Sequence, residues 1–179
     1  MVEFEDSVFS GKSKLETVKI PSNSKLKYIG NYTFSNTALS SFTLPSGVVS
    51  IGNHCFNNTE LATFVFGEGS DIKIGDNVFS GCTELKTLVI KRNIQPLNQE
   101  TDPKDLFADL NLDCVCCSEE DYGIFVVSKY LLGDETPFDD DSKVYQGSKA
   151  QEWCSDFLST EFNQAETNAI LSTTKSDDK

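Results

Sequence analysis

The sequence lacks the long apolar runs that place a chain in or across a membrane. None approaches the roughly 18 consecutive apolar residues that a membrane-spanning helix needs. The N-terminal stretch MVEFEDSVFSG is acidic, whereas a secretory signal has a basic start and an apolar centre. These absences leave two expectations: a cytoplasmic protein, or one part of a longer protein.

The sequence also lacks catalytic motifs. Its one histidine, His54, follows Gly52 closely and is interpreted as a turn or convex-face residue. No Gly-x-Ser-x-Gly stretch, phosphate loop or dinucleotide fingerprint is present. We therefore predict no enzymatic activity, no catalytic residue, no cofactor and no metal.

No basic stripe runs along the chain, whose formal net charge is −13. Residues 1–97 hold nine acids and nine bases, whereas residues 98–179 hold 19 acids and six bases. A border near Pro96 and Leu97 is therefore predicted between two regions of different character. Since an acidic chain repels phosphate, nucleic acid and anionic membranes are not expected as partners. Membrane insertion is not expected either, because the sequence lacks a long apolar run.

What the sequence does contain is a repeat of about 23 residues. One phenylalanine marks each copy, and five residues before it lies Phe4 or an isoleucine. A leucine follows each phenylalanine after five or six residues. The marker phenylalanines are Phe9, Phe34, Phe56 and Phe79, and the leucines are Leu15, Leu39, Leu61 and Leu85. These constant offsets predict two buried columns, one of each residue type.

Each leucine opens the pattern Leu-x-x-apolar-x-apolar, which ends in two-residue alternation. That alternation predicts one short, half-buried strand in each copy, with Val18 and Ile20 in the first. One copy cannot bury its own apolar face, whereas stacked copies can. The pattern predicts a solenoid with parallel strands. A β-sandwich with evenly spaced strands is the alternative, but it does not explain identical residues at identical offsets.

The stretches IGNYTFSNTALSSFTLP, FSGCTELKTLVI and SGVVSIG resemble the leucine-rich repeats of BspA-type bacterial and protist surface proteins. The resemblance covers about residues 4–95. It implies an α/β-type repeat protein that forms a right-handed leucine-rich-repeat solenoid. Each turn of about 23 residues would contribute one short parallel strand, and a strand and a helix would cap the C-terminal end. The repeats depart from the family where Lys91 replaces a proline and where GEGSDI is inserted.

Three segments are expected along the chain. Residues 1–97 form a solenoid of about four turns, and residues 98–165 form an acidic region that covers its C-terminal end. A helix near 148–162 is predicted from Ser148 and Gln151, which fit a capping box, and from apolar residues on one face, including Trp153 and Phe157. Residues 166–179 are polar and predicted to be disordered.

The six cysteines are interpreted as mostly reduced thiols. Cys55 and Cys82 occupy inner turn positions with different offsets from the marker phenylalanine, so both are predicted to be buried and free. Buried thiols are also favoured at the other positions, and a disulfide or a zinc site among them remains an alternative. Those positions are Cys114, Cys116, Cys117 and Cys154.

Two further patterns have ordinary explanations. The run DETPFDDD lacks the ligand spacing of an EF-hand and is interpreted as a solvated loop. Asn31 and Asn57 match glycosylation acceptors, which matter only in a secreted eukaryotic protein.

We expect a non-enzymatic protein-interaction module whose partner binds the strand face. The third and fifth residues of each strand pattern are expected to point outward in two columns. An enzyme or metalloprotein that uses the cysteine-rich segment is the least favoured hypothesis. The expected partner-binding residues are Thr17, Lys19, Ser41, Thr43, Thr63, Val65, Thr87 and Val89.

The family resemblance implies cell-surface adhesion to a protein, for example a host matrix or cell-surface protein. It also implies a location at the cell surface as part of a longer protein, with the cytoplasm as the alternative. A structural spacer or end cap with no ligand of its own is the competing function. The chain is expected to be a monomer or part of a longer chain.

Overall fold

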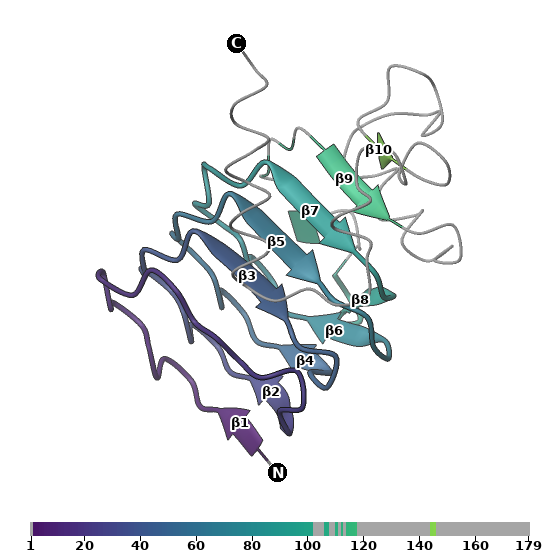
Figure 1. Cartoon of the computed structure of the whole chain (residues 1–179), viewed down its shortest axis with the longest axis horizontal. Helices are drawn as coiled ribbons and strands as arrows, with labels where there is room; N and C mark the ends of the chain where they lie inside the picture. The colour runs from purple at the N-terminus through teal and green to yellow at the C-terminus, as the bar shows by residue number, and fades with distance from the viewer. Residues whose placement is uncertain are drawn as a thin grey trace.

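The structure is a computed structural model that describes residues 2–101, 106–107, 110, 112, 114–117 and 144–145. The described residues form ten short strands in a stack of turns (Figure 1). The strands are β1 (Val2–Phe4), β2 (Leu26–Ile29), β3 (Ser41–Leu44), β4 (Ser50–Ile51), β5 (Thr63–Phe66), β6 (Ile72–Ile74), β7 (Thr87–Ile90), β8 (Ile94–Pro96), β9 (Cys114–Cys117) and β10 (Val144–Tyr145).

The strands form two five-stranded parallel sheets. Sheet A has the order β1-β2-β4-β6-β8, and sheet B has the order β10-β9-β7-β5-β3. Figure 1 shows β3, β5, β7 and β9 lying side by side, with β2, β4 and β6 forming the other side of the stack. This arrangement confirms the predicted parallel solenoid and adds a second strand to each turn that the sequence analysis did not predict.

One predicted strand is absent. Residues 17–20, which carry the alternating Val18 and Ile20, belong to neither sheet, and β3 is the outermost strand of sheet B on that side. Val18 and Ile20 are only partly buried against the core. Described residues pack on this turn from one side only, so its alternating apolar residues gain less from pairing than those of later turns.

The predicted column of phenylalanines is confirmed. Neighbouring rings stack almost parallel, with centroids 5.4 Å apart for Phe9 and Phe34, 5.2 Å for Phe34 and Phe56, and 6.0 Å for Phe56 and Phe79. Leu39, Leu61 and Leu85 are fully buried as a second column, while Leu15 is partly buried. Both columns belong to the hydrophobic core, together with apolar residues from strands of both sheets.

A fifth ring extends the column beyond the four predicted. Phe107 stacks on Phe79 with a centroid separation of 6.1 Å and is buried together with Leu106 and Leu112. These three residues belong to the region expected to cover the C-terminal end of the solenoid. The helix near 148–162 and the tail at 166–179 lie outside the described residues, and no described residue is in an α-helix.

A ladder of Asp and Asn side chains runs along the outside of the turns. The Asn31 backbone N–H donates to Asp6 Oδ1, the Asn53 N–H donates to Asn31 Oδ1, and the Asp76 N–H donates to Asn53 Oδ1. The ladder ends where Thr101 Oγ1 donates to Asp76 Oδ1. Each turn therefore satisfies a backbone donor of the next turn with a side-chain oxygen.

The ladder explains the repeated glycine in the Ile-Gly pair. A Cβ atom at Gly52 would lie 2.5 Å from the Asn31 backbone nitrogen and 2.7 Å from Asn31 Oδ1. No side chain fits at that separation, so the close approach of successive turns requires glycine there.

The structure confirms that Cys55 and Cys82 are buried and free. Cys82 Sγ lies 3.0 Å from the Phe56 carbonyl oxygen and 3.1 Å from Thr59 Oγ1. Burial raises the pKa of both thiols above the ordinary value of 9.0. Both thiols are therefore protonated at neutral pH, and neither has the character of a reactive cysteine.

Truncating the phenylalanine column should show how far stability depends on it. Phe56→Ala removes a fully buried ring that lies between Phe34 and Phe79, and we expect the free energy of unfolding to fall by about 3–5 kcal/mol. Phe9→Ala, at the partly buried end of the column, should cost clearly less. Chemical denaturation measures both. Equal losses would mean that the column does not gain stability from burial.

The buried thiols give a prediction for pH. As the pH rises above about 9, the unfolded chain releases the Cys55 proton while the folded chain keeps it. The free energy of unfolding should then fall by about 1.4 kcal/mol per pH unit for this thiol. Denaturation curves between pH 8 and 10.5 measure the slope, and Cys55→Ala should flatten it. An identical slope in wild type and variant would contradict the burial of this thiol.

Candidate partner-binding face

The strand register confirms the two predicted columns in the second, third and fourth turns. Ser41 pairs with Thr63 and Thr63 with Thr87, while Thr43 pairs with Val65 and Val65 with Val89. Both columns continue by register into β9, at Cys114 and Cys116. The alternating residues between them, such as Phe64 and Leu88, join the hydrophobic core. The columns therefore lie on the sheet B face that points away from the core.

Pointing away from the core does not make these positions accessible. Thr17 and Lys19 are exposed, but they lie outside sheet B. Thr43 and Thr87 are half-buried. The expectation of an open surface is wrong for the four remaining positions: Ser41, Thr63, Val65 and Val89 are all buried. Strand alternation fixes which face a side chain occupies, but it does not determine whether that face is open to solvent.

Thr63 lies at the centre of this face and is an exception to ordinary hydrogen bonding. Its hydroxyl oxygen is buried and has no hydrogen-bond partner among the residues that the structure describes. Such a group loses its interaction with water without a replacement, which costs about 1–3 kcal/mol. Thr63 is therefore a position where a polar contact from another group would add stability.

The sequence analysis treated His54 alone and missed its neighbour. His54 and Tyr32, 22 residues apart at equivalent repeat positions, stack their rings with centroids 4.8 Å apart and planes 8° from parallel. His54 lies in a turn, as predicted, and both residues have left-handed backbone conformations with φ of 53° and 55°. The equal offset of two aromatic residues from the marker phenylalanine is the signal that would have found the pair.

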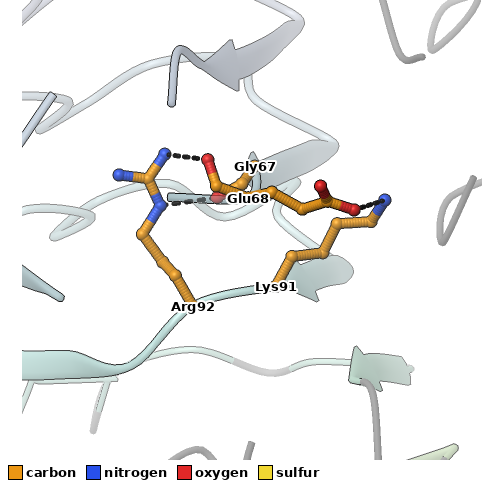
Figure 2. A network of polar contacts seen from close by, with 4 residues as sticks. All are labelled: Gly67, Glu68, Lys91 and Arg92. Carbon is orange, nitrogen blue, oxygen red and sulfur yellow. Dashed lines mark hydrogen bonds and ion pairs between the residues drawn. The ribbon is translucent and has the colours of Figure 1, made fainter. Parts of the chain in front are cut away.

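The most constrained polar group in the described part of the chain is Arg92, the single arginine of the sequence. Its guanidinium is buried and donates to four backbone carbonyls. Nε lies 2.5 Å from the Gly67 oxygen and Nη1 lies 2.7 Å from the Val48 oxygen. Nη2 lies 2.9 Å from the Pro45 oxygen and 3.2 Å from the Glu68 oxygen. Figure 2 shows the guanidinium directed at the Gly67–Glu68 backbone.

Arg92 joins loops from three successive turns. Pro45 and Val48 belong to one loop, and Gly67 and Glu68 begin the inserted GEGSDI segment of the next. A Cβ atom at Gly69 would lie 3.0 Å from Arg92 Cζ, so the insertion passes directly over the guanidinium. The insertion and the only arginine are therefore one structural unit, which the sequence analysis did not recognise.

The charge of Arg92 is balanced by carbonyl dipoles. Burial lowers the pKa of the guanidinium to about 10, which leaves it protonated at neutral pH. The neighbouring Lys91 instead pairs with the Glu68 carboxylate at 3.7 Å (Figure 2). The Glu68 side chain is largely exposed, whereas the Lys91 side chain is only 7% exposed, so the ion pair lies at the edge of the buried region. Arg92 thus has a structural role.

The described residues contain no group of three or more His, Cys, Asp or Glu side chains arranged to hold a metal ion. Cys154, one of the cysteines considered for a zinc site, lies outside the part of the chain that the structure describes. Among the described residues, no helix is long and apolar enough to cross a membrane.

Comparison with protein families agrees with this geometry. Residues 2–115, more than half of the chain, match the model described as "BspA type Leucine rich repeat region (6 copies)". The chain belongs to the BspA-type leucine-rich-repeat family. The match extends past residue 97, where the sequence analysis placed the end of the solenoid. No curated protein and no solved structure matches the chain.

Substituting Arg92 should destabilise the loops that it joins. Arg92→Met leaves the carbonyls of Val48 and Pro45 without their charged donor, and we expect a loss of about 2–4 kcal/mol. Arg92→Lys should recover only part of this, because an ammonium group lacks the planar fork that reaches several loops. Thermal and chemical denaturation measure both variants.

Glu68→Gln is the matched control for Arg92, because it removes only the ion pair to Lys91. It should lower the free energy of unfolding by less than Arg92→Met does, because the Glu68 side chain is 57% exposed and the four carbonyl contacts remain. A loss for Arg92→Met as small as that for Glu68→Gln would mean that the four carbonyl contacts do not hold the loops together.

Proposed function

We propose that this BspA-type repeat module is non-enzymatic and binds a protein through the sheet B face. The observation that supports the proposal is the pair of register columns, which places small, uncharged side chains at fixed spacing across successive strands. Repeat proteins use such surfaces because each position varies independently while the backbone stays constant.

The accessible part of this face defines where binding would begin. Thr43 and Thr87 are half-buried on β3 and β7, and the exposed Thr17 and Lys19 lie in the turn before β3. Hydroxyl, aliphatic and ammonium groups spread over several turns suit the extended surface of a protein better than a small molecule, which needs a concave pocket. The buried positions would support these four residues without touching the partner.

The proposal includes the finer expectations from the family resemblance. The module would act in cell adhesion at the cell surface as part of a longer protein, with a host matrix or cell-surface protein as the partner. Nucleic acid is not an expected partner, since the described turns balance positive with negative charge and the remainder of the chain is acidic.

A structural spacer or end cap with no ligand of its own is the second candidate. The burial of Val65 and Val89 favours it, because both residues belong to the face expected to bind. A spacer needs only turns that stack stably, and the phenylalanine column and the Asx ladder meet that need.

Charge-introducing variants test the binding face. We expect Thr43→Glu and Thr87→Glu, made together, to weaken capture of proteins from an extract of animal-cell matrix and surface proteins by about tenfold or more, because burying an unpaired charge at the contact is costly. Lys73→Glu is the matched control on sheet A, where the side chain is exposed. Immobilised full-length chain and quantitative mass spectrometry of captured proteins provide the measurement.

Two other outcomes would decide against the proposal. Equal capture by wild type and both variants would place binding elsewhere, and loss of capture only after Asp139, Asp140 and Asp141 are changed to Ser would place it in the acidic region. We expect those serine substitutions to change mainly the salt dependence, because exposed charges act on association rate more than on affinity. A wild-type chain that captures nothing would favour the spacer.

A further inference from the structure

The two sheets differ in how open their outward faces are. On sheet B, Thr63 and Val89 have none of their surface accessible, and Val65 has 1%. On sheet A the register aligns one outward column whose members are all exposed or half-buried. That column consists of Tyr28, Ser50, Lys73 and Gln95. The outward face of sheet B is therefore closed, while that of sheet A is open.

Strand pairing does not explain this difference. In sheet B, β5 lies between β3 and β7, just as β4 lies between β2 and β6 in sheet A. Side chains stand roughly perpendicular to a sheet, so neighbouring strands shield their sides but leave their tips open. The burial of Val65 and Val89 therefore requires a further layer over sheet B.

The face also shows which chemistry this layer has. Val65 and Val89 are apolar, and the buried Thr63 hydroxyl has no hydrogen-bond partner among the described residues. An apolar group placed over this hydroxyl removes its water without supplying a replacement. Thr43 and Thr87 each make an interaction in addition to their strand pairing. The covering layer is therefore apolar over the buried positions and has polar groups at its sides.

The chain holds a segment of this chemistry next to sheet B. Strand β10 pairs with β9 at the end of that sheet, and Tyr145 lies only three residues before Ser148, within reach of about 10 Å. Residues 148–162 carry the helical pattern described above, with an apolar stripe at offsets of three and four residues. The stripe consists of Ala150, Trp153, Cys154, Phe157 and Leu158.

The length of this segment matches the width of the face. A helix over residues 148–162 is about 22 Å long. The strands from β9 to β3 are three spacings of about 4.8 Å apart, or about 14 Å. A helix that starts beside β10 is therefore long enough to cross β9, β7, β5 and β3.

We propose that residues 148–162 lie across the outward face of sheet B, with their apolar stripe on Val65 and Val89, and that a protein partner must displace them to occupy this face. The sequence predicted that this helix caps the C-terminal end of the solenoid. The closed face of sheet B instead assigns it to the side of the stack.

The regulatory half of this proposal rests on the proposed function. A partner can touch the half-buried Thr43 and Thr87 while the face is covered, but it reaches Val65 and Val89 only after the segment has left. Because only the open fraction of molecules binds fully, the covering segment lowers the apparent affinity by that fraction. The module would then be autoinhibited, with the helix and the partner competing for one face.

Thiol labelling on the full chain tests the cover. Val65→Cys places a thiol under the segment, and Lys73→Cys places one on the open face of sheet A. Mass spectrometry of the labelled peptides should show residue 65 reacting at least about tenfold more slowly than residue 73. The native Cys55, which is fully buried in the core, reports global unfolding in the same molecules.

Variants in the segment test which residues form the cover. Trp153→Asp and Phe157→Asp, made together, put charge into the apolar stripe and should speed labelling at residue 65 at least about tenfold, because a buried unpaired charge is costly. Labelling of Cys55 should stay unchanged. Ser155→Asp is the matched control, since it adds the same group on the polar side of the predicted helix.

Three labelling results would overturn the proposal. The first is a wild-type background in which residue 65 reacts as fast as residue 73. The second is equal labelling at residue 65 in the Trp153→Asp/Phe157→Asp variant and in Ser155→Asp, which would assign the cover to another segment. The third is protection that is lost on dilution, which would assign it to a second copy of the chain.

Protein capture by the immobilised full chain tests the regulatory half separately. The Trp153→Asp/Phe157→Asp variant, with Val65 in place, should capture at least about fivefold more protein from the matrix and surface extract than Ser155→Asp does, because more molecules have an open face. Faster labelling without increased capture would confirm the cover and reject both the autoinhibition and the binding function of sheet B. Increased capture that Thr43→Glu and Thr87→Glu abolish would confirm both.

Discussion

Every part of this structure depends on the contact between one turn and the next. A turn of about 23 residues contributes one ring to the phenylalanine column, one leucine to the second column, and short strands to the sheets. It has no second layer of its own against which to bury them. Burial arises only when Phe34, Phe56 and Phe79 stack in register. The same register aligns the strands of both sheets, so the hydrophobic contact and the hydrogen-bond ladders require the same spacing between turns.

That spacing is kept small by polar groups on the outside of the stack. The Asx side chains accept backbone N–H groups from the following turn, and glycine beside them leaves room for the approach. Beside the GEGSDI insertion, Arg92 adds four hydrogen bonds to backbone carbonyls of the neighbouring turns. A charged group can be buried here because carbonyl dipoles satisfy every nitrogen of its fork.

The parts of the fold that repeat could be predicted from the sequence, because constant offsets translate directly into columns. Phe56, Leu61 and the Thr63–Val65 pair all lie in the columns expected for them. Features that occur once could not be predicted in this way. Arg92 has no equivalent in other turns, and the second strand of each turn is only two to four residues long. The burial of Val65 and Val89 could not be predicted either, since alternation assigns a side chain to a face of the sheet but does not determine whether that face is open to solvent.

The two ends of the stack show what a repeat architecture leaves for other residues to solve. At the C-terminal end, Phe107 continues the ring column and removes Phe79 from solvent. At the N-terminal end, the same column finishes at Phe9, which is only partly buried, beside the exposed Val2 and Val8. In a middle turn, the residues equivalent to these would be covered by the turns on both sides. Phe79 stacks with a ring on either side and is buried, whereas Phe9 stacks with Phe34 alone among the described residues and is only partly buried.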